Sequence, residues 1–542
     1  MPGLPRIDRA GAALIALFGV LYCLNLSAIE LSDTDEGRSG VLVRDMVEGG
    51  RRLLPRTPDG YLIEKPLAYY GTAAVLGSLL GINEWTLRGV SVAAALVCLW
   101  AVWTLARLYS SSRAAGLAVV LLGSNILFLF SARQAMVDMT LSCFVTLGLL
   151  FYFAARLGRM QRWTAAGLAG IAFGLAILSK GPVGLVLPGA IVAVDALLSF
   201  WGRFRAALPA AGPVLVASVL ALLVSMAWYL PGLLSGGKEF LETSILSENF
   251  RMPVGEAEGI GVAHKKPFYY YFMYQLVAVL PALPLLATIP GWLRSRESDP
   301  ARRHLGAWFL GGFVLFLVAS NKRFYYLVPL QPAVAIAIAL SAERALAQAP
   351  RRLLTVPAAV MGVLAVTAAL GAVVMVSAPS LLERFGREGA FAEALRNHRP
   401  AFAAMAAALL AIGAVLVVAS RKGSEAALRA AAGLAVVVIA CRTGAADRLE
   451  AEFDHTREFV RTATRALPPG AKPVILPPIK GYSMEFYWPD RLVRDERAAP
   501  ASEYVMVLRP NLDRVPDVRQ EIAVWKFRNA RNDVVLLRRG KP

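Results

Sequence analysis

Short blocks of charged and aromatic residues stand at the ends of apolar stretches along this chain. The block at 33–38 contains Asp35 and Arg38, which lie on one side of a helix because they are three positions apart. The block at 64–66 reads Glu-Lys-Pro and precedes another apolar run. Further blocks of this kind occupy residues 133–138, 179–182, 247–251, 264–271 and 320–326. These residue types, in these places, are candidates for chemistry at a membrane surface.

Ionisable groups at membrane depth are costly unless they face a polar cavity and meet a partner or substrate. Lysine and arginine side chains can stabilise the charge that develops on a departing phosphate, and a carboxylate can orient or deprotonate an acceptor. The pattern therefore favours group transfer from an anionic donor held by a lipid tail. No nucleophile elbow, P-loop, dinucleotide fingerprint or thiolate zinc motif occurs in the sequence.

Each block also has a purely structural explanation. Ser32 or Asp33 could cap a surface helix with an acidic first turn. Lysine, arginine and tyrosine, as at 264–271, could anchor a helix end among lipid headgroups. Since several such blocks fall on one expected side of the membrane, a shared polar site is the better interpretation.

The composition identifies the kind of protein that must position these blocks. Of 542 residues, 57% are hydrophobic and only 18% are charged, and the mean hydropathy is +0.54. Apolar windows of about 20 residues recur, as expected for transmembrane helices. Four cysteines in or beside apolar segments give no disulfide framework. We therefore predict an α-helical polytopic membrane protein.

Apolar runs predict about 13 transmembrane helices and a cytoplasmic N-terminus. The run at 10–29 is too long for a signal-peptide core, so an uncleaved first helix is expected. The run at 66–81 is short, and if it spanned, the later arginine-rich loops would lie outside, so it is expected at the interface. The net charge of +19 is then a positive-inside signal rather than a nucleic-acid patch, and the blocks lie on the outer side.

The composition changes near residue 444. We predict a transmembrane domain over 1–443, with catalytic loops at 30–87 and 232–268, and a small outer α/β domain over 444–542. In the latter, helical periodicity covers 448–467 and ends at Pro468. Short β-rich runs follow at 473–476, 504–508, 522–527 and 533–537.

At these same blocks the chain resembles the bacterial lipid A aminoarabinose transferases, within the GT-C class of glycosyltransferases that use polyprenyl-phosphate sugars. The resemblance covers roughly 10–340 by motif and the whole chain by layout. The motifs that carry it lie at 34–38, 64–70, 179–182, 248–251, 264–271 and 323–330, together with Asp138. One departure is Leu67, where the family has a second proline after Glu-Lys-Pro.

The resemblance implies transfer of 4-amino-4-deoxy-L-arabinose from undecaprenyl phosphate to lipid A phosphates, which protects the cell from polymyxin. It implies a periplasmic site on the bacterial inner membrane. In that family's pattern Asp35 lies at the reaction centre and Asp138 helps to shape the sugar pocket. Residues expected to contact the substrates, mostly at their phosphates, are Arg38, Lys65, Lys180, Arg251, Arg323 and Tyr325.

The resemblance also bears on cofactors and partners. Glu64 and His264 resemble a divalent-metal pair, with zinc as a candidate ion, although two ligands make an incomplete site and no cofactor is firmly required. The expected partners are the lipid-linked donor, the lipid A acceptor and membrane lipids, with no nucleic acid, and the chain is expected to be a monomer.

Other functions remain open at this point. The same enzyme class could transfer galacturonic acid to lipid A, or a hexose to a glycan or a protein. A cationic amino sugar would favour acidic pocket residues, for which the candidates are Glu36, Asp138, Glu485 and Glu496. A lipid flippase is less favoured because the predicted span interiors contain few charges besides Asp195.

Overall fold

A computed structural model describes most of the chain. The described residues are 3–32, 35–200, 204–251, 266–295, 299–319, 321–348, 355–377, 397–447, 455–476, 479, 481–489, 492, 502–515, 517–525 and 533–540. They divide into two compact units. The first unit comprises 1–24, 64–69 and 89–446, and the second comprises 25–63, 70–88 and 447–542.

The first unit is built almost entirely from helices. Its helices are α1 (Arg9–Cys23), α4 (Glu84–Tyr109, whose first turn lies in the second unit), α5 (Ser112–Gly123), α6 (Ile126–Ala132), α7 (Val137–Arg156), α8 (Arg162–Lys180), α9 (Val183–Phe200), α10 (Phe204–Phe240), the π-helical η1 (Leu241–Arg251), α12 (Tyr270–Ala278), the 3-10 helix η3 (Leu280–Thr288), α13 (Ile289–Arg294), α14 (Pro300–Val318), the 3-10 helix η4 (Phe324–Leu330), α15 (Gln331–Gln348), α16 (Thr355–Ser377), α19 (Arg399–Lys422), α20 (Ser424–Cys441) and the π-helical η5 (Arg442–Ala446).

Among the described residues, seven helices are long and apolar enough to cross a membrane. An eighth span is possible if α5 and α6, bent by 68°, form one broken span. Four shorter apolar helices add to these, among them the one at Leu67–Leu80. A polytopic membrane protein is therefore confirmed by length and composition, whereas the predicted number of thirteen spans is not.

The first apolar run forms a shorter helix than predicted. Asp8 accepts a hydrogen bond from the Gly11 N–H at 2.7 Å and so caps α1. The helix ends at Cys23 rather than near residue 29, because Leu24 has an extended ψ of 127° and Asn25 a left-handed φ of 51°.

The ambiguous run at 66–81 forms α3 (Leu67–Leu80), a helix of 14 residues. At 1.5 Å per residue it is about 21 Å long, which is shorter than the roughly 30 Å of hydrocarbon that a span must cross. Its length therefore agrees with the interfacial placement expected from the charge pattern.

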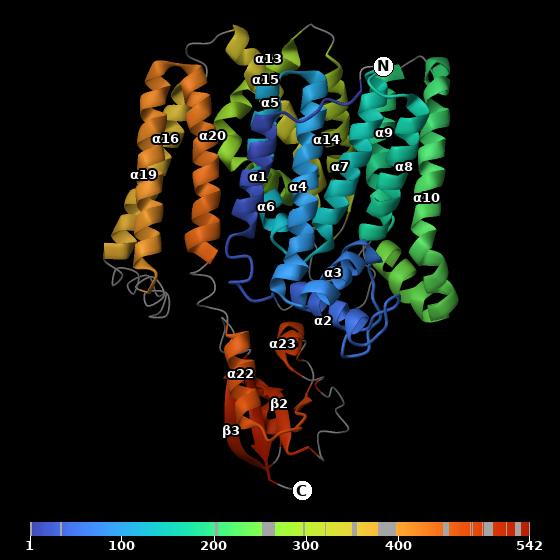
Figure 1. The fold of residues 1–542 in the computed structure, drawn as a ribbon, viewed down its shortest axis with the longest axis vertical. Coiled ribbons are helices and arrows are strands. Elements are labelled where there is room, and N and C mark those ends of the chain that lie inside the picture. The colour runs from blue at the N-terminus through green and yellow to red at the C-terminus, as the bar shows by residue number, and fades with distance from the viewer. Residues whose placement is uncertain are drawn as a thin grey trace. The chain divides into compact units, whose positions relative to one another are not determined.

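Helices of the first unit pack in groups that do not follow the sequence order, since α10 lies mainly against α8 rather than α9. Figure 1 shows α16, α19 and α20 side by side, and separately α8, α9 and α10. A Cβ atom on Gly184 of α9 would lie 2.3 Å from the backbone of Ala176, so only glycine permits the close approach of α8 and α9. This close approach fixes the turn that follows Lys180.

The second unit combines the first long loop with the C-terminal segment. It contains α2 (Glu36–Val47), most of α3, α22 (Thr456–Ala466), α23 (Tyr482–Tyr487), the 3-10 helix η7 (Arg509–Arg514) and the strands β1 (Val474–Ile475), β2 (Tyr504–Leu508), β3 (Val518–Trp525) and β4 (Val534–Arg539). The strands form one sheet in the order β1-β2-β4-β3, in which only β1 and β2 are parallel.

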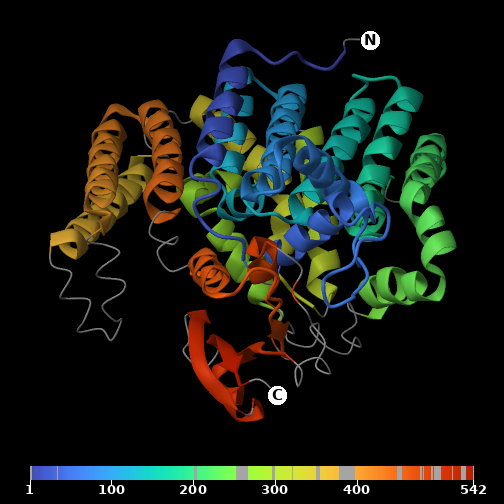
Figure 2. The ribbon, with the colours of Figure 1, turned by 60° about the horizontal axis from the view of Figure 1, so that its bottom comes forward.

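The sheet of the second unit has an apolar cluster on each face. Alternate residues of β2 and β4 point to opposite faces, as the pleat requires. On one face, Met506 and Leu536 pack with Phe459 and Ala463 of α22, which lies against β3 (Figure 2). A strand occurs at each of the four predicted runs, although β3 begins at Val518 rather than at 522 and β4 extends to Arg539. Helix α22 ends just before Pro468, as predicted, but begins at Thr456, and residues 448–454 of the predicted helix lie outside the described part. Helix α23 was not predicted.

Candidate active site

Two charged residues predicted to share a site form a buried ion pair in the first unit. Lys180 is the last residue of α8, and Asp138 is the second residue of α7. The ammonium Nζ of Lys180 lies 2.5 Å from Oδ1 of Asp138, and their side chains are 13% and 4% exposed. Because the two residues are 42 positions apart, this pair shows that the blocks at 133–138 and 179–182 converge.

The sequence Lys-Gly-Pro fixes where the Lys180 side chain begins. Gly181 has a φ of 76°, a conformation that glycine adopts without strain, and it ends α8 directly after the lysine. Its N–H donates to the carbonyl of Ile177 at 2.7 Å. Lys180 therefore lies at the very end of a rigid helix, where a cation also interacts favourably with the helix dipole.

Aromatic rings from a third block cover the same ammonium group. Nζ of Lys180 lies 3.9 Å from the ring centre of Tyr326 and 5.6 Å from that of Tyr325. The guanidinium of Arg323 lies 5.9 Å from the Tyr325 ring. Such distances are typical of cation–π contacts. Arg323, Tyr325 and Tyr326 of this block therefore lie around Lys180, and the predicted convergence of the block with Lys180 is observed for these residues.

The 3-10 helix η4 holds the two tyrosines in place. Trp308 donates its indole N–H to the carbonyl of Pro329 at 3.0 Å. Gln331 donates to the carbonyl of Leu327 at 2.9 Å and also bonds the buried Asn125 side chain. These buried hydrogen bonds would have to break for η4 to move, so Tyr325 and Tyr326 are held by the packed interior.

Arg133, the first residue of the block at 133–138, has a structural role. Its guanidinium donates to the carbonyl of Tyr22 and, at 3.4 Å, to that of Leu21. Both carbonyls belong to the last turn of α1, where backbone acceptors have no helical partner. The arginine therefore anchors the end of α1.

Helix α2, which follows the predicted reaction-centre residue Asp35, lies in the second unit. Asp35 is half-buried at the N-cap position of α2, and Arg38, also half-buried, follows in its first turn. Asp35 makes no side-chain capping bond; its carbonyl accepts from the Ser39 hydroxyl at 2.9 Å. Ser32 was named as a possible N-cap of this helix, and that was wrong, because its N–H donates to the Glu36 carboxylate at 3.1 Å. The other candidate, Asp33, lies outside the described residues.

Glu36 is fully buried in an ion pair that the sequence analysis missed. Arg88 reaches its carboxylate at 2.7 and 2.8 Å and also bonds the carbonyls of Leu26, Ile29 and Glu30 at 2.7 to 3.0 Å. Glu36 is 1% exposed and Arg88 3%. The pair fixes the start of α2, which gives Glu36 a structural role. The signal was Arg88 itself, a charge at the start of an apolar run.

Helix α22 is capped from a distant segment. The carboxylate of Glu30 accepts hydrogen bonds from the backbone N–H groups of Thr456 and Arg457 at 2.8 and 2.9 Å. A carboxylate in this place satisfies N-terminal donors of the helix and complements its dipole.

Glu84, Arg457 and Tyr487 form a second charged contact within the same unit. Arg457 pairs with Glu84, and the Tyr487 hydroxyl donates to Glu84 at 2.6 Å. Burial, followed by the nearby Glu84 charge, raises the pKa of Tyr487. Burial would lower the pKa of Arg457, but the neighbouring Tyr487 and Glu84 outweigh it and raise that pKa.

Helices α2 and α23 pack directly against each other. Arg44 of α2 donates to the carbonyls of Glu485, Phe486 and Trp488, which satisfies the acceptors at the end of α23. Gly37 and Gly40 face α23 so closely that an added Cβ would lie 2.5 Å from the Ser483 backbone or the Phe486 ring. The helix that follows Asp35 is thus held by C-terminal residues.

The remaining predicted site residues lie in several places. Glu64 and Lys65 are half-buried just before α3, within the first unit. Arg251 ends η1, and its side chain is outside the described part, as are His264 and Glu496. Among the described residues, no group of three or more His, Cys, Asp or Glu side chains could hold a metal ion.

Comparison with known proteins supports the resemblance. A family model described as dolichyl-phosphate-mannose-protein mannosyltransferase matches residues 64–229. An undecaprenyl phosphate-α-4-amino-4-deoxy-L-arabinose arabinosyl transferase of Pectobacterium atrosepticum is 29% identical over 332 residues, which cover 60% of this chain and 57% of the relative. A second such transferase, from Proteus mirabilis, is 27% identical over 346 residues, covering 62% and 60%. The matches span about three fifths of the length of these curated relatives.

The similarity in fold extends over nearly the whole chain. The crystal structure of ArnT from Cupriavidus metallidurans bound to undecaprenyl phosphate superposes with a TM-score of 0.75 at 18% identity, covering 97% of both chains. The apo form of the same protein gives a TM-score of 0.74 at 19% identity, again with 97% of both chains covered. The predicted GT-C-type fold with a small C-terminal domain is thereby confirmed, as is the resemblance to the aminoarabinose transferases.

Proposed function

We propose that this chain is an integral-membrane glycosyltransferase that moves 4-amino-4-deoxy-L-arabinose from undecaprenyl phosphate to phosphate groups of lipid A. The reaction would take place at the periplasmic face of the bacterial inner membrane and would give resistance to polymyxin. The observation that carries the proposal is the Lys180–Asp138 pair beneath Tyr325 and Tyr326. The names of the related transferases and the bound lipid of the ArnT structure support it.

The transfer exchanges one phosphate for another at the anomeric carbon of the sugar. The bond between that carbon and the donor phosphate oxygen breaks, and undecaprenyl phosphate leaves with the electron pair. A lipid A phosphate oxygen forms the new bond. Negative charge therefore grows on the departing phosphate, and a fixed cation beside it lowers the barrier.

Lys180 is the residue best placed in the first unit to supply that cation. An ammonium group has three N–H donors, so its bond to Asp138 does not by itself exclude a phosphate oxygen. Asp138 holds the ammonium in place, and the faces of Tyr325 and Tyr326 limit its movement. Arg323, over Tyr325, adds a second positive charge to the same region.

Asp35 has a positioning or electrostatic role in this proposal. A lipid A phosphate is already ionised and needs no general base, whereas a hydroxyl acceptor would have to lose a proton. Asp35 would then orient groups or balance the oxocarbenium-like charge of the sugar. Arg38 and Lys65 are proposed to contact phosphate groups of the substrates, together with Arg251.

A divalent metal remains a weaker part of the proposal. Glu64 would be one ligand and His264 the other, and two protein ligands make an incomplete site. The described residues supply only Glu64 of this pair, so no step of the reaction is assigned to a metal.

A second candidate is a transferase of the same class with a different sugar or acceptor. The family model that matches residues 64–229 is named for transfer of mannose from dolichyl phosphate to protein. A protein hydroxyl as acceptor would require a base, and Asp35 would then take its proton. Transfer of galacturonic acid to lipid A is a further possibility within the class.

The experiment compares lipid A from cells with and without the protein by mass spectrometry. We expect a mass increment of one pentosamine that is lost in the Asp35→Ala and Lys180→Met variants. Leu198→Trp, a change at an exposed α9 position, is the matched control and should keep the increment. Unchanged lipid A with a modified protein or glycan would replace this proposal by the second candidate.

A further inference from the structure

A large cavity lies in the first unit, away from Lys180. Its volume is about 660 Å³, and it is bounded by α7, α8, α9 and α10. The lining is mostly apolar and includes many small side chains, such as Ala166 and Ala169 of α8 and Gly189 of α9. Exposed Val186 and Leu215 on α9 and α10 flank it, so it opens toward the lipid-facing surface.

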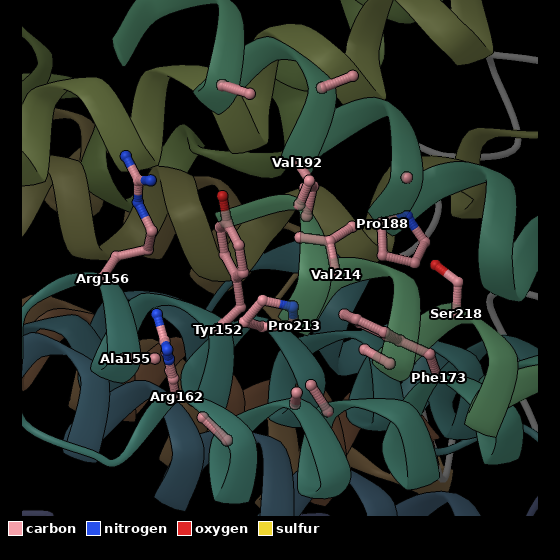
Figure 3. Close-up of a pocket in the computed structure, with 18 of the residues that line it drawn as sticks. Tyr152, Ala155, Arg156, Arg162, Phe173, Pro188, Val192, Pro213, Val214 and Ser218 are labelled. Carbon is pink, nitrogen blue, oxygen red and sulfur yellow. The ribbon is translucent and has the colours of Figure 1, made fainter. Parts of the chain in front are cut away.

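The cavity has one charged end and one apolar end. Figure 3 shows Arg156 and Arg162 at one end and Phe173 and Ser218 at the other. Arg162 and Phe173 are 11 positions apart on α8, which corresponds to about 16 Å along the helix axis. Half of a roughly 30 Å hydrocarbon core is about the same length. The cavity therefore matches the depth of one membrane leaflet.

The charged end carries an excess of positive charge. Arg156 lies 3.4 Å from Asp195 and donates to Ser199 at 2.8 Å, and Arg303 lies 3.5 Å from the same aspartate. Arg162 is exposed, lies over the Trp163 ring at 5.3 Å, and makes no ion pair in the described part of the chain. Arg156 and Arg303 thus share one buried carboxylate, and Arg162 adds a further positive charge at the rim of the cavity, so this end complements an anionic group.

The charged end is also far from the proposed active site. Arg162 and Lys180 are the first and last residues of α8, 18 positions apart, so they lie about 27 Å from each other along the helix. That distance is close to the thickness of the hydrocarbon core. A ligand whose headgroup lies at Arg162 therefore belongs to the opposite leaflet from Lys180.

We propose that this cavity binds a phospholipid with a net negative headgroup. The headgroup lies at Arg156 and Arg162, and one acyl chain extends between α8, α9 and α10 toward Phe173. An anionic headgroup gains about 1 kcal/mol for each basic residue near the surface, or roughly a fivefold change in affinity. A zwitterionic phospholipid gains less from the same arginines. This site does not depend on the proposed transferase function.

Native mass spectrometry of the full-length protein in detergent tests the headgroup. We expect the wild-type protein to bind phosphatidylglycerol about tenfold more tightly than phosphatidylcholine with the same chains. Arg162→Glu should weaken phosphatidylglycerol binding about tenfold, because it reverses a charge at the headgroup. Arg159→Glu, an equal change at an exposed residue of the same loop, is the control and should have little effect.

A second pair of variants tests the acyl chain. Val192→Trp places an indole in the cavity, whereas Leu198→Trp changes an exposed position on the same helix that does not line the cavity. Only the first should reduce lipid binding. Equal affinity for the two phospholipids in the wild-type protein overturns the proposal, even if a variant fails to fold. The proposal is also overturned if a polyprenyl phosphate binds more tightly than phosphatidylglycerol and Val192→Trp removes that binding. It is overturned as well if the two variants of either matched pair lose the same amount of phospholipid binding.

Discussion

At the scale of single residues, buried ion pairs join distant parts of each unit. In the first unit, Lys180 and Asp138 join the ends of α8 and α7. Removing one member of such a pair leaves an uncompensated buried charge, which commonly costs about 3–5 kcal/mol, whereas replacing both can be nearly neutral. This difference separates a structural contribution of the pair from a chemical one.

We therefore predict opposite outcomes for stability and activity when both residues are replaced. Asp138→Asn and Lys180→Met should each lower the free energy of unfolding by about 3 kcal/mol. The double variant should regain most of that stability but should not transfer sugar, because the cation is gone. Thermal unfolding in detergent and the lipid A mass assay measure the two effects. An active double variant would show that Lys180 only stabilises the fold.

The Arg88–Glu36 pair allows a similar test of geometry rather than charge. Arg88 uses its planar guanidinium to bond a carboxylate and three carbonyls at once, and a lysine cannot reproduce this arrangement. Arg88→Lys should lower the free energy of unfolding by about 2–3 kcal/mol. Arg113→Lys, in a pair with Glu425 whose side chains are 87% and 58% exposed, is the control. A thermal shift of equal size in both variants would contradict this role.

At the scale of elements, α2 depends on small residues for its position. Gly→Ala within a helix usually stabilises by roughly 0.5–1 kcal/mol. At Gly37 and Gly40 the added methyl would instead meet the Ser483 backbone and the Phe486 ring, both at 2.5 Å. The sign of the usual effect should therefore reverse.

The prediction is that Gly37→Ala and Gly40→Ala each lower the free energy of unfolding by about 1–3 kcal/mol. Gly167→Ala, at a helical glycine of α8 with no atom within 4 Å of the added Cβ, is the matched control and should be neutral or stabilising. Thermal unfolding in detergent compares the three. Destabilisation by Gly167→Ala alone would argue against close packing of α2 on α23.

The elements also show what the sequence could and could not predict. A short continuous run of apolar residues predicted β2 at its observed bounds, because a strand that is buried on both faces has this local pattern. Aromatic and charged blocks predicted that Lys180, Asp138 and Tyr325 come together. The Glu36–Arg88 pair and the Glu30 cap of α22 were missed, because they join residues 52 and 426 positions apart. A local pattern can mark one member of such a pair, as the charge of Arg88 does, but it does not identify the distant partner.

At the scale of the whole molecule, the chain is not divided at one point into a membrane part and a soluble part. Residues 25–63 and 70–88 form one compact unit with 447–542. Asp35 and Arg38 start a helix whose neighbours come from the last hundred residues. Changes in the C-terminal segment should therefore influence the residues proposed to act on substrate.

The last prediction concerns the sidedness of the molecule, on which the proposed periplasmic reaction depends. Helix α8 has a basic loop before Arg162 and the proposed active-site lysine at its other end, about 27 Å away. Basic loops remain in the cytoplasm. In a variant without native cysteines, Lys472→Cys should react with an impermeant maleimide in intact spheroplasts.

Arg159→Cys, at an equally exposed loop position, should react only after the membrane is permeabilised. If the cysteine at position 472 is protected in intact spheroplasts and the cysteine at position 159 is labelled, the orientation in the membrane is the reverse of the proposed one. Lys180 would then face the cytoplasm, where the predicted lipid A acceptor site could not lie. The proposed reaction would be contradicted even though the fold and the buried pairs would remain.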